Sequence, residues 1–133
     1  MQYINRWYRS KDRTLEVEFL FVELDETRGW RAYILSHINY GMRSSAQTDV
    51  HRLTENDSYM CGVVNNFKRN NPPLNYMLIR DSSIDYVCWT ATVDSLDQMM
   101  SIASVWTDIT AYYIRYGGSF PEIQRKLSRE GVI

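Results

Sequence analysis

The side chains that most often bind metals or act as nucleophiles are few in this sequence and far apart. They are His37, His51, Cys61 and Cys88. No two of them stand at the separation of about two to five residues that is typical of zinc sites. Cys88 also lies within the apolar run YVCWT, which favours a buried thiol over a reactive thiolate. The sequence therefore predicts neither a metal site nor cysteine–histidine catalysis.

Acidic residues and glycines form no recognisable catalytic or cofactor motif either. Asp81, Asp85 and Asp94 are spread along a turn and a strand, so they do not make a general acid/base pair. Neither GxGxxG nor GxxxxGK[ST] occurs, and nothing indicates a nucleotide bound by a glycine-rich loop. We expect a protein without a cofactor and without enzymatic activity.

One short segment, RWYRSKDR at residues 6–13, interleaves cations with aromatic rings. Its members are Arg6, Trp7, Tyr8, Arg9, Lys11 and Arg13. This composition suits base stacking and phosphate contact, as in proteins that bind single-stranded nucleic acid. Alternatively, the two rings pack under a sheet while the cations stay in water or pair with the acids of LEVEFLFVELDE. The segment is a candidate interaction surface under the first interpretation.

The segments 14–24 and 30–38, TLEVEFLFVEL and WRAYILSHI, are rich in β-branched and aromatic residues and predict a hairpin. The intervening loop, taken as 25–29, ends in Gly29, which tolerates a positive φ. A register that begins with Leu24 opposite Trp30 also aligns an opposite-charge pair and an aromatic pair.

Apolar side chains are expected on both faces of this hairpin. Four of them fall on the second face in the expected register and need a cover: Leu20, Val22, Trp30 and Ile34. A second copy of the chain could provide that cover, which makes a homodimer one hypothesis. The last helix of the chain is the alternative cover.

A helix of about twenty residues is predicted within 95–116, followed by a short last helix in FPEIQRKLSRE. Ser95 with Gln98, and Ser119 with Glu122, have the spacing of capping boxes. A polar stripe on the long helix predicts its solvent side: Asp97, Ser101, Ser104, Asp108, Ala111 and Arg115. The opposite side, which includes Trp106 and Tyr116, is predicted to face the core.

The remaining pattern contains strand candidates at 50–54 and 84–93 and a weaker helix candidate at 57–69. The 133 residues and the net charge of −1 are typical of one globular domain that is neither strongly basic nor strongly acidic. The expected fold is α+β, with a three- to four-stranded antiparallel sheet packed by a long C-terminal helix plus a short terminal helix. The N-terminal residues show no apolar signal segment and no stretch could span a membrane, so we expect a cytoplasmic protein.

The run YVCWTATVDSLDQMMSIASVWTDITAYYIRYGGSF resembles small accessory proteins carried on conjugative elements and plasmids of Gram-positive gut bacteria. Such proteins often bind host or defence proteins, anti-CRISPR inhibitors among them. The resemblance implies a non-enzymatic accessory or inhibitor protein that binds another protein. The alternative expectation is a nucleic-acid-binding module that uses residues 6–13.

Overall fold

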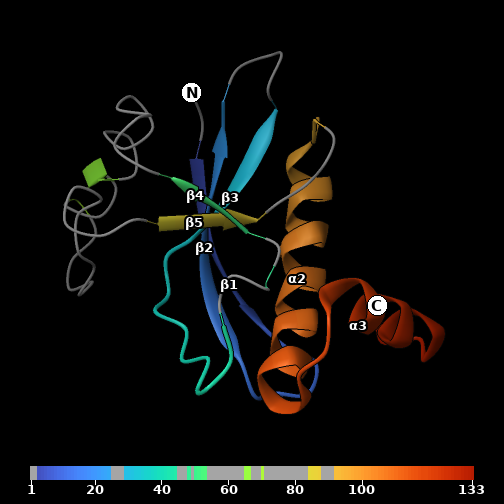
Figure 1. Ribbon diagram of the computed structural model, residues 1–133. Coiled ribbons are helices and arrows are strands. Elements are labelled where there is room, and N and C mark those ends of the chain that lie inside the picture. The colour runs from blue at the N-terminus through green and yellow to red at the C-terminus, as the bar shows by residue number, and fades with distance from the viewer. Residues whose placement is uncertain are drawn as a thin grey trace.

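The computed structural model describes residues 3–24, 29–44, 48, 50–53, 65, 66, 70, 84–87 and 92–133. The described part is an antiparallel sheet followed in sequence by two helices, so the expected α+β class is confirmed (Figure 1). Its elements are β1 (Tyr3–Arg9), β2 (Glu16–Glu23), β3 (Trp30–Ile34), β4 (Val50–Leu53), β5 (Ile84–Val87), α2 (Leu96–Tyr116) and α3 (Phe120–Arg129).

The described strands form a five-stranded sheet in the order β1-β2-β3-β5-β4. This is one strand more than the three or four that were expected, and the strand that was not expected is β1. It pairs with β2 along its whole length, from Tyr3 opposite Val22 to Arg9 opposite Glu16. Strands β5 and β4 cross the direction of β1 to β3 steeply, which reflects a strongly twisted sheet (Figure 1). Helix α2 lies across one face, and α3 turns away from its end (Figure 1).

The hairpin of β2 and β3 has a register one residue away from the expected one. The Leu24 amide donates to the Gly29 carbonyl over 2.8 Å, so the loop closes one residue earlier than expected. Phe21 therefore lies opposite Ala32, and Leu20 lies opposite Tyr33. Gly29 has the expected positive φ of 66°. An added Cβ would lie 2.3 Å from the Val93 carbonyl oxygen, so the chain passes too close there for any side chain.

The observed register changes which residues lie on the second face of the hairpin, the face that points away from α2. Trp30 and Ile34 belong with Phe19 and Phe21 to the core under α2, because directly opposite residues of paired strands share a face. Leu20 and Val22 do lie on the other face, but both are 0% exposed within the chain itself. Trp30 and Ile34 are 8% and 7% exposed. None of the four is an exposed interaction surface, and the face-covering argument for a homodimer is wrong.

Both helices begin at the residues that the capping pattern predicts. The Ser95 hydroxyl accepts from the Gln98 amide at 3.1 Å, and the Ser119 hydroxyl accepts from the Glu122 amide at 3.3 Å. Helix α2 ends at Gly117, which has a φ of 79°. These local signals were sufficient because a cap depends on residues within one turn of the helix end.

The predicted solvent stripe of α2 is only partly confirmed. Asp97, Ser101 and Arg115 are exposed, but Asp108 is 6% and Ala111 is 3% exposed. The burial of Asp108 has a cause outside the helix, since the Lys11 amide in the turn between β1 and β2 donates to its carboxylate. Trp106 is buried as expected, whereas Tyr116 is 58% exposed.

Two buried side chains of α2 fasten it to the segment that follows β3. Trp106 Nε1 donates to the Thr48 carbonyl over 2.7 Å, and the Tyr113 hydroxyl donates to the Ser44 carbonyl over 2.8 Å. The Trp106 ring also meets the Phe19 ring edge-on, with centroids 6.0 Å apart. The aromatic residues of α2 thus hold the helix to both the sheet and the loop beyond it.

The strand candidates at 50–54 and 84–93 are represented by β4 and β5, each four residues long. Residues 88–91 lie outside the described residues, as do Cys61, Cys88 and Asp81 and most of the helix candidate at 57–69. Among the described residues, no helix combines the length and the apolar character required to cross a membrane.

Candidate functional site

Among the described strands, β1 is the last on its side of the sheet, and alternate residues along it direct their backbone groups away from β2. The Leu35 amide donates to the Glu18 carbonyl and the Leu24 amide to the Gly29 carbonyl, so even-numbered residues of β2 bond to β3. Odd-numbered residues of β2 consequently bond to β1, where their register partners are Ile4, Arg6 and Tyr8. The outward backbone groups belong to the other residues of the strand: Tyr3, Asn5, Trp7 and Arg9.

The side chains of these outward residues share the face of the sheet opposite α2. Two are large and well exposed, Tyr3 at 49% and Trp7 at 55%. Asn5, between them, donates from Nδ2 to Glu18 Oε2 at 2.9 Å and to the Phe19 carbonyl at 3.0 Å. Glu18 is only 3% exposed, so this amide holds a buried carboxylate beside the exposed rings. The edge therefore combines outward backbone groups with two exposed aromatic side chains.

Arg6 and Tyr8 lie on the other face, toward α2. The Tyr8 ring meets the Phe19 and Phe21 rings edge-on, with centroids 5.8 Å and 6.2 Å apart. Burial raises the pKa of the Tyr8 hydroxyl, an effect that the nearby Arg6 opposes. Arg6 itself is exposed, and its Nη1 donates to the Asn5 carbonyl over 2.9 Å. One of the outward acceptors of β1 is thus occupied by a side chain of the same strand.

The remaining cations of segment 6–13 are partly matched by acids. Arg9 Nη2 lies 3.5 Å from Glu16 Oε2, with both side chains exposed. Lys11 Nζ lies 2.7 Å from Asp108 Oδ2, and the Lys11 amide donates to Asp108 Oδ1 at 2.8 Å. The segment is consequently split between two faces and a turn, and its rings and cations do not form one continuous stripe.

The turn after β1 is held by Asp12. Partial burial acts to raise the pKa of its carboxyl, but hydrogen bonds from the Ser10 hydroxyl and from the Thr14 amide and hydroxyl outweigh it and lower the pKa. Arg13 has a φ of 65°, a left-handed conformation that is uncommon for a residue other than glycine. These contacts set the direction in which the chain leaves β1.

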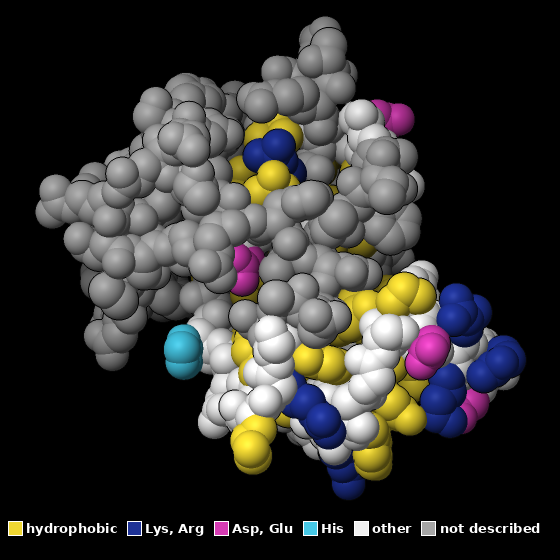
Figure 2. Space-filling view, viewed as in Figure 1, with side chains coloured by type: hydrophobic (Ala, Val, Ile, Leu, Met, Phe, Trp, Pro, Cys, Tyr) yellow, Lys and Arg dark blue, Asp and Glu magenta, His cyan; other side chains and the backbone are white. Residues whose placement is uncertain are grey.

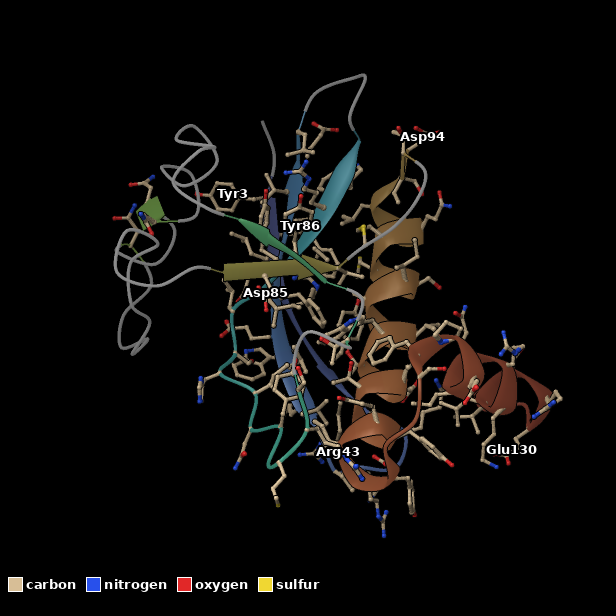
Figure 3. The ribbon with its side chains drawn as sticks, viewed as in Figure 1. Tyr3, Arg43, Asp85, Tyr86, Asp94 and Glu130 are labelled. Atoms are coloured by element: carbon tan, nitrogen blue, oxygen red, sulfur yellow. The ribbon has the colours of Figure 1, made fainter. Side chains whose placement is uncertain are left out.

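Other polar groups in the described part of the chain do not converge. No group of three or more His, Cys, Asp or Glu side chains that could hold a metal ion occurs among the described residues. Asp85 and Asp94 lie far apart, on β5 and before α2 (Figure 3). Lysine and arginine side chains gather over α3, but acidic side chains lie among them, and Lys126 pairs with Glu130 (Figure 2). These observations leave β1 as the best-defined candidate site.

Two residues of this site, Tyr3 and Asn5, were missed by the sequence reasoning. The available signal was the alternation of residues at positions 3, 5, 7 and 9, which is the period of a strand with one exposed side. The concentration of charge in 6–13 obscured it, because cations and rings occupy both alternating sets. The exposed aromatic pair of the strand is Tyr3 with Trp7 and not Trp7 with Tyr8.

Comparison of the chain with models of known protein families, with characterised proteins and with solved structures found no match.

Proposed function

We propose that this chain is a cytoplasmic, non-enzymatic accessory or inhibitor protein that binds a partner protein by adding a strand of that partner to the outer edge of β1. The observation that carries the proposal is the outward backbone of Asn5, Trp7 and Arg9 beside the exposed rings of Tyr3 and Trp7. In strand addition, backbone hydrogen bonds supply affinity, and side chains at alternate positions supply specificity. Aromatic residues are also enriched in protein interfaces.

Strand β1 has one of the features that protect an edge strand, the charged side chains of Arg6 and Arg9, but not others. It contains no proline and no lysine, and its register with β2 is continuous over seven residues without a bulge. The guanidinium of Arg6 also makes a protective contact, because it donates to the outward carbonyl of Asn5. An edge strand with outward backbone groups is a template for pairing with another chain, which supports a role in binding.

Nucleic-acid binding through segment 6–13 has less support. Trp7 and Tyr8 lie on opposite faces of the sheet, so one strand of nucleic acid could not stack on both. Two of the cations, Arg9 and Lys11, already lie beside acids. A resemblance to accessory proteins of mobile elements, anti-CRISPR inhibitors among them, agrees with the protein-binding proposal and does not define the target.

The proposal is tested with random linear peptides displayed on phage and selected on the wild-type protein. Recovered peptides are then titrated against wild type, Trp7→Pro and Tyr116→Ala. Trp7→Pro removes an outward amide and an exposed ring, and an edge strand tolerates proline where the amide faces outward. We expect it to weaken peptide binding about tenfold or more, since 1.4 kcal/mol corresponds to a factor of ten.

Tyr116→Ala is the matched control, because Tyr116 is 58% exposed and belongs to α2 and not to β1. It should leave peptide affinity unchanged. Recovery of peptides that bind Trp7→Pro as tightly as wild type, or recovery of none, would refute binding at this edge. Equal urea midpoints for the two variants exclude unfolding as the cause of a difference.

A further inference from the structure

Arg6 is the residue of the β1 edge that can distinguish one partner from another. Its side chain is exposed on the α2 side of the sheet, and Nη1 donates to the outward carbonyl of Asn5 over 2.9 Å. An added strand needs that carbonyl for its own amide. Binding at the edge therefore displaces the Arg6 guanidinium from its present acceptor.

The geometry of antiparallel pairing determines where the displaced guanidinium goes. Asn5 and Trp7 direct their backbone groups to the added strand, so Arg6 between them falls in a non-hydrogen-bonded pair. In such pairs the two Cα atoms are only about 4.5 Å apart, and opposing side chains are at their closest. The residue opposite Arg6 consequently lies within direct reach of the guanidinium.

A second copy of this chain is a poor occupant by the same geometry. Pairing β1 with itself over its full length, residues 3–9, places the two-fold axis at Arg6 and sets the two Arg6 side chains opposite each other. Directly opposed like charges destabilise a strand pair. Centring the pair on Asn5 or Trp7 avoids this contact but shortens the overlap to residues 3–7 or 5–9.

We infer that the partner contributes an extended segment that pairs antiparallel with β1 and carries an acidic residue opposite Arg6. This inference rests on the proposed function. The acidic residue receives the guanidinium that leaves the Asn5 carbonyl, so the partner replaces the hydrogen bond that it breaks. The neighbours of Arg6 on the same face, Ile4 and Tyr8, are half-buried, and they favour apolar residues two positions on either side of the acid.

The test compares peptide selections on wild type, Arg6→Gln and Arg6→Glu, using the same random library. Only peptides whose binding is weakened by Trp7→Pro are counted, which restricts the comparison to edge binders. Wild type should enrich Asp or Glu at one position flanked by apolar residues. Arg6→Gln should lose this preference while still binding edge peptides, and Arg6→Glu should enrich Lys or Arg at the same position.

For one recovered peptide, replacing its acid by lysine should weaken binding to wild type about tenfold and strengthen binding to Arg6→Glu. Edge-dependent peptides without acidic enrichment would overturn the inference and leave the proposed function standing. An acidic preference that is unaltered in Arg6→Glu would also overturn the inference and leave the proposed function standing. If no recovered peptide depends on the edge, the proposed function and the inference fail together.

Discussion

Asp108 shows how a single side chain can decide the position of a turn. Its carboxylate is 5% exposed on α2 and accepts from both the amide and the ammonium of Lys11. Replacement by alanine leaves the Lys11 amide without this acceptor in a partly buried place. We expect Asp108→Ala to lower the free energy of unfolding by about 1–3 kcal/mol, measured by urea denaturation.

Lys11→Met separates the two contacts of Asp108. It keeps the backbone amide and removes only the ammonium, whose side chain is 57% exposed. Exposed ion pairs contribute little, so the loss should stay below about 1 kcal/mol. Equal losses in the two variants would show that the charge, and not the hydrogen bond from the backbone, holds the turn on α2.

Thr110 presents the opposite situation, a buried hydroxyl in the interior of α2. It is 0% exposed, and its Oγ1 has no hydrogen-bond partner within the described part of the chain. Valine has the same shape without the hydroxyl. Thr110→Val should therefore leave the free energy of unfolding unchanged or raise it by about 1 kcal/mol.

Thr107→Val is the control for Thr110, because the Thr107 hydroxyl is also buried but donates to the Ala103 carbonyl over 2.8 Å. Its loss should cost about 1 kcal/mol in the same urea measurement. A lower stability for Thr110→Val than for Thr107→Val would mean that Thr110 Oγ1 has a partner in solution.

At the scale of the elements, the helices could be predicted from the sequence and the arrangement of the strands could not. The capping residues Ser95 and Ser119 act within one helical turn, so the local sequence is sufficient to predict where each helix begins. Asp108 fits the solvent stripe of α2 equally well, yet its burial depends on Lys11, which is 97 positions away. Contacts of that range leave no periodic signal in the sequence.

The hairpin and the edge strand show why strand predictions are less certain. When a hairpin loop is one residue shorter than expected, the residues of the second strand fall on the opposite faces of the sheet. For this reason Trp30 and Ile34 lie in the core and not on the second face where they were expected. The existence of the hairpin was nevertheless predictable from its β-branched and aromatic content. Strand β1 has the composition of a binding segment, and only its pairing with β2 reveals that it belongs to the sheet.

Amide hydrogen exchange provides a direct measurement of the β1 edge. Inward amides, at Arg6 and Tyr8, should exchange slowly, while the outward amides of Asn5, Trp7 and Arg9 should exchange near the rates of an unstructured chain. The reason is that only the inward set is bonded to β2. Uniform protection along β1 would indicate that another chain already occupies the edge.

At the scale of the whole molecule, the β1 edge and the charge of Arg6 lead to an expectation about self-association. Four apolar side chains that could have joined two copies are buried within one chain, so β1 is the best-defined route to a dimer in the described part of the chain. When two β1 strands pair over residues 3–9, their Arg6 side chains lie opposite each other, and the repulsion between the like charges destabilises such a dimer. The wild-type protein should consequently be monomeric at micromolar concentration.

Arg6→Val removes the repulsion, frees the Asn5 carbonyl and places a good strand-forming residue at the centre of β1. Static light scattering should then show a mass that rises with concentration toward that of a dimer. Arg9→Val is the matched control, since in the full-length register Arg9 lies opposite Tyr3 and not opposite its own copy. It should remain monomeric. A wild-type dimer, or equal association of both variants, would contradict the assignment of Arg6 as the residue that keeps two β1 edges apart.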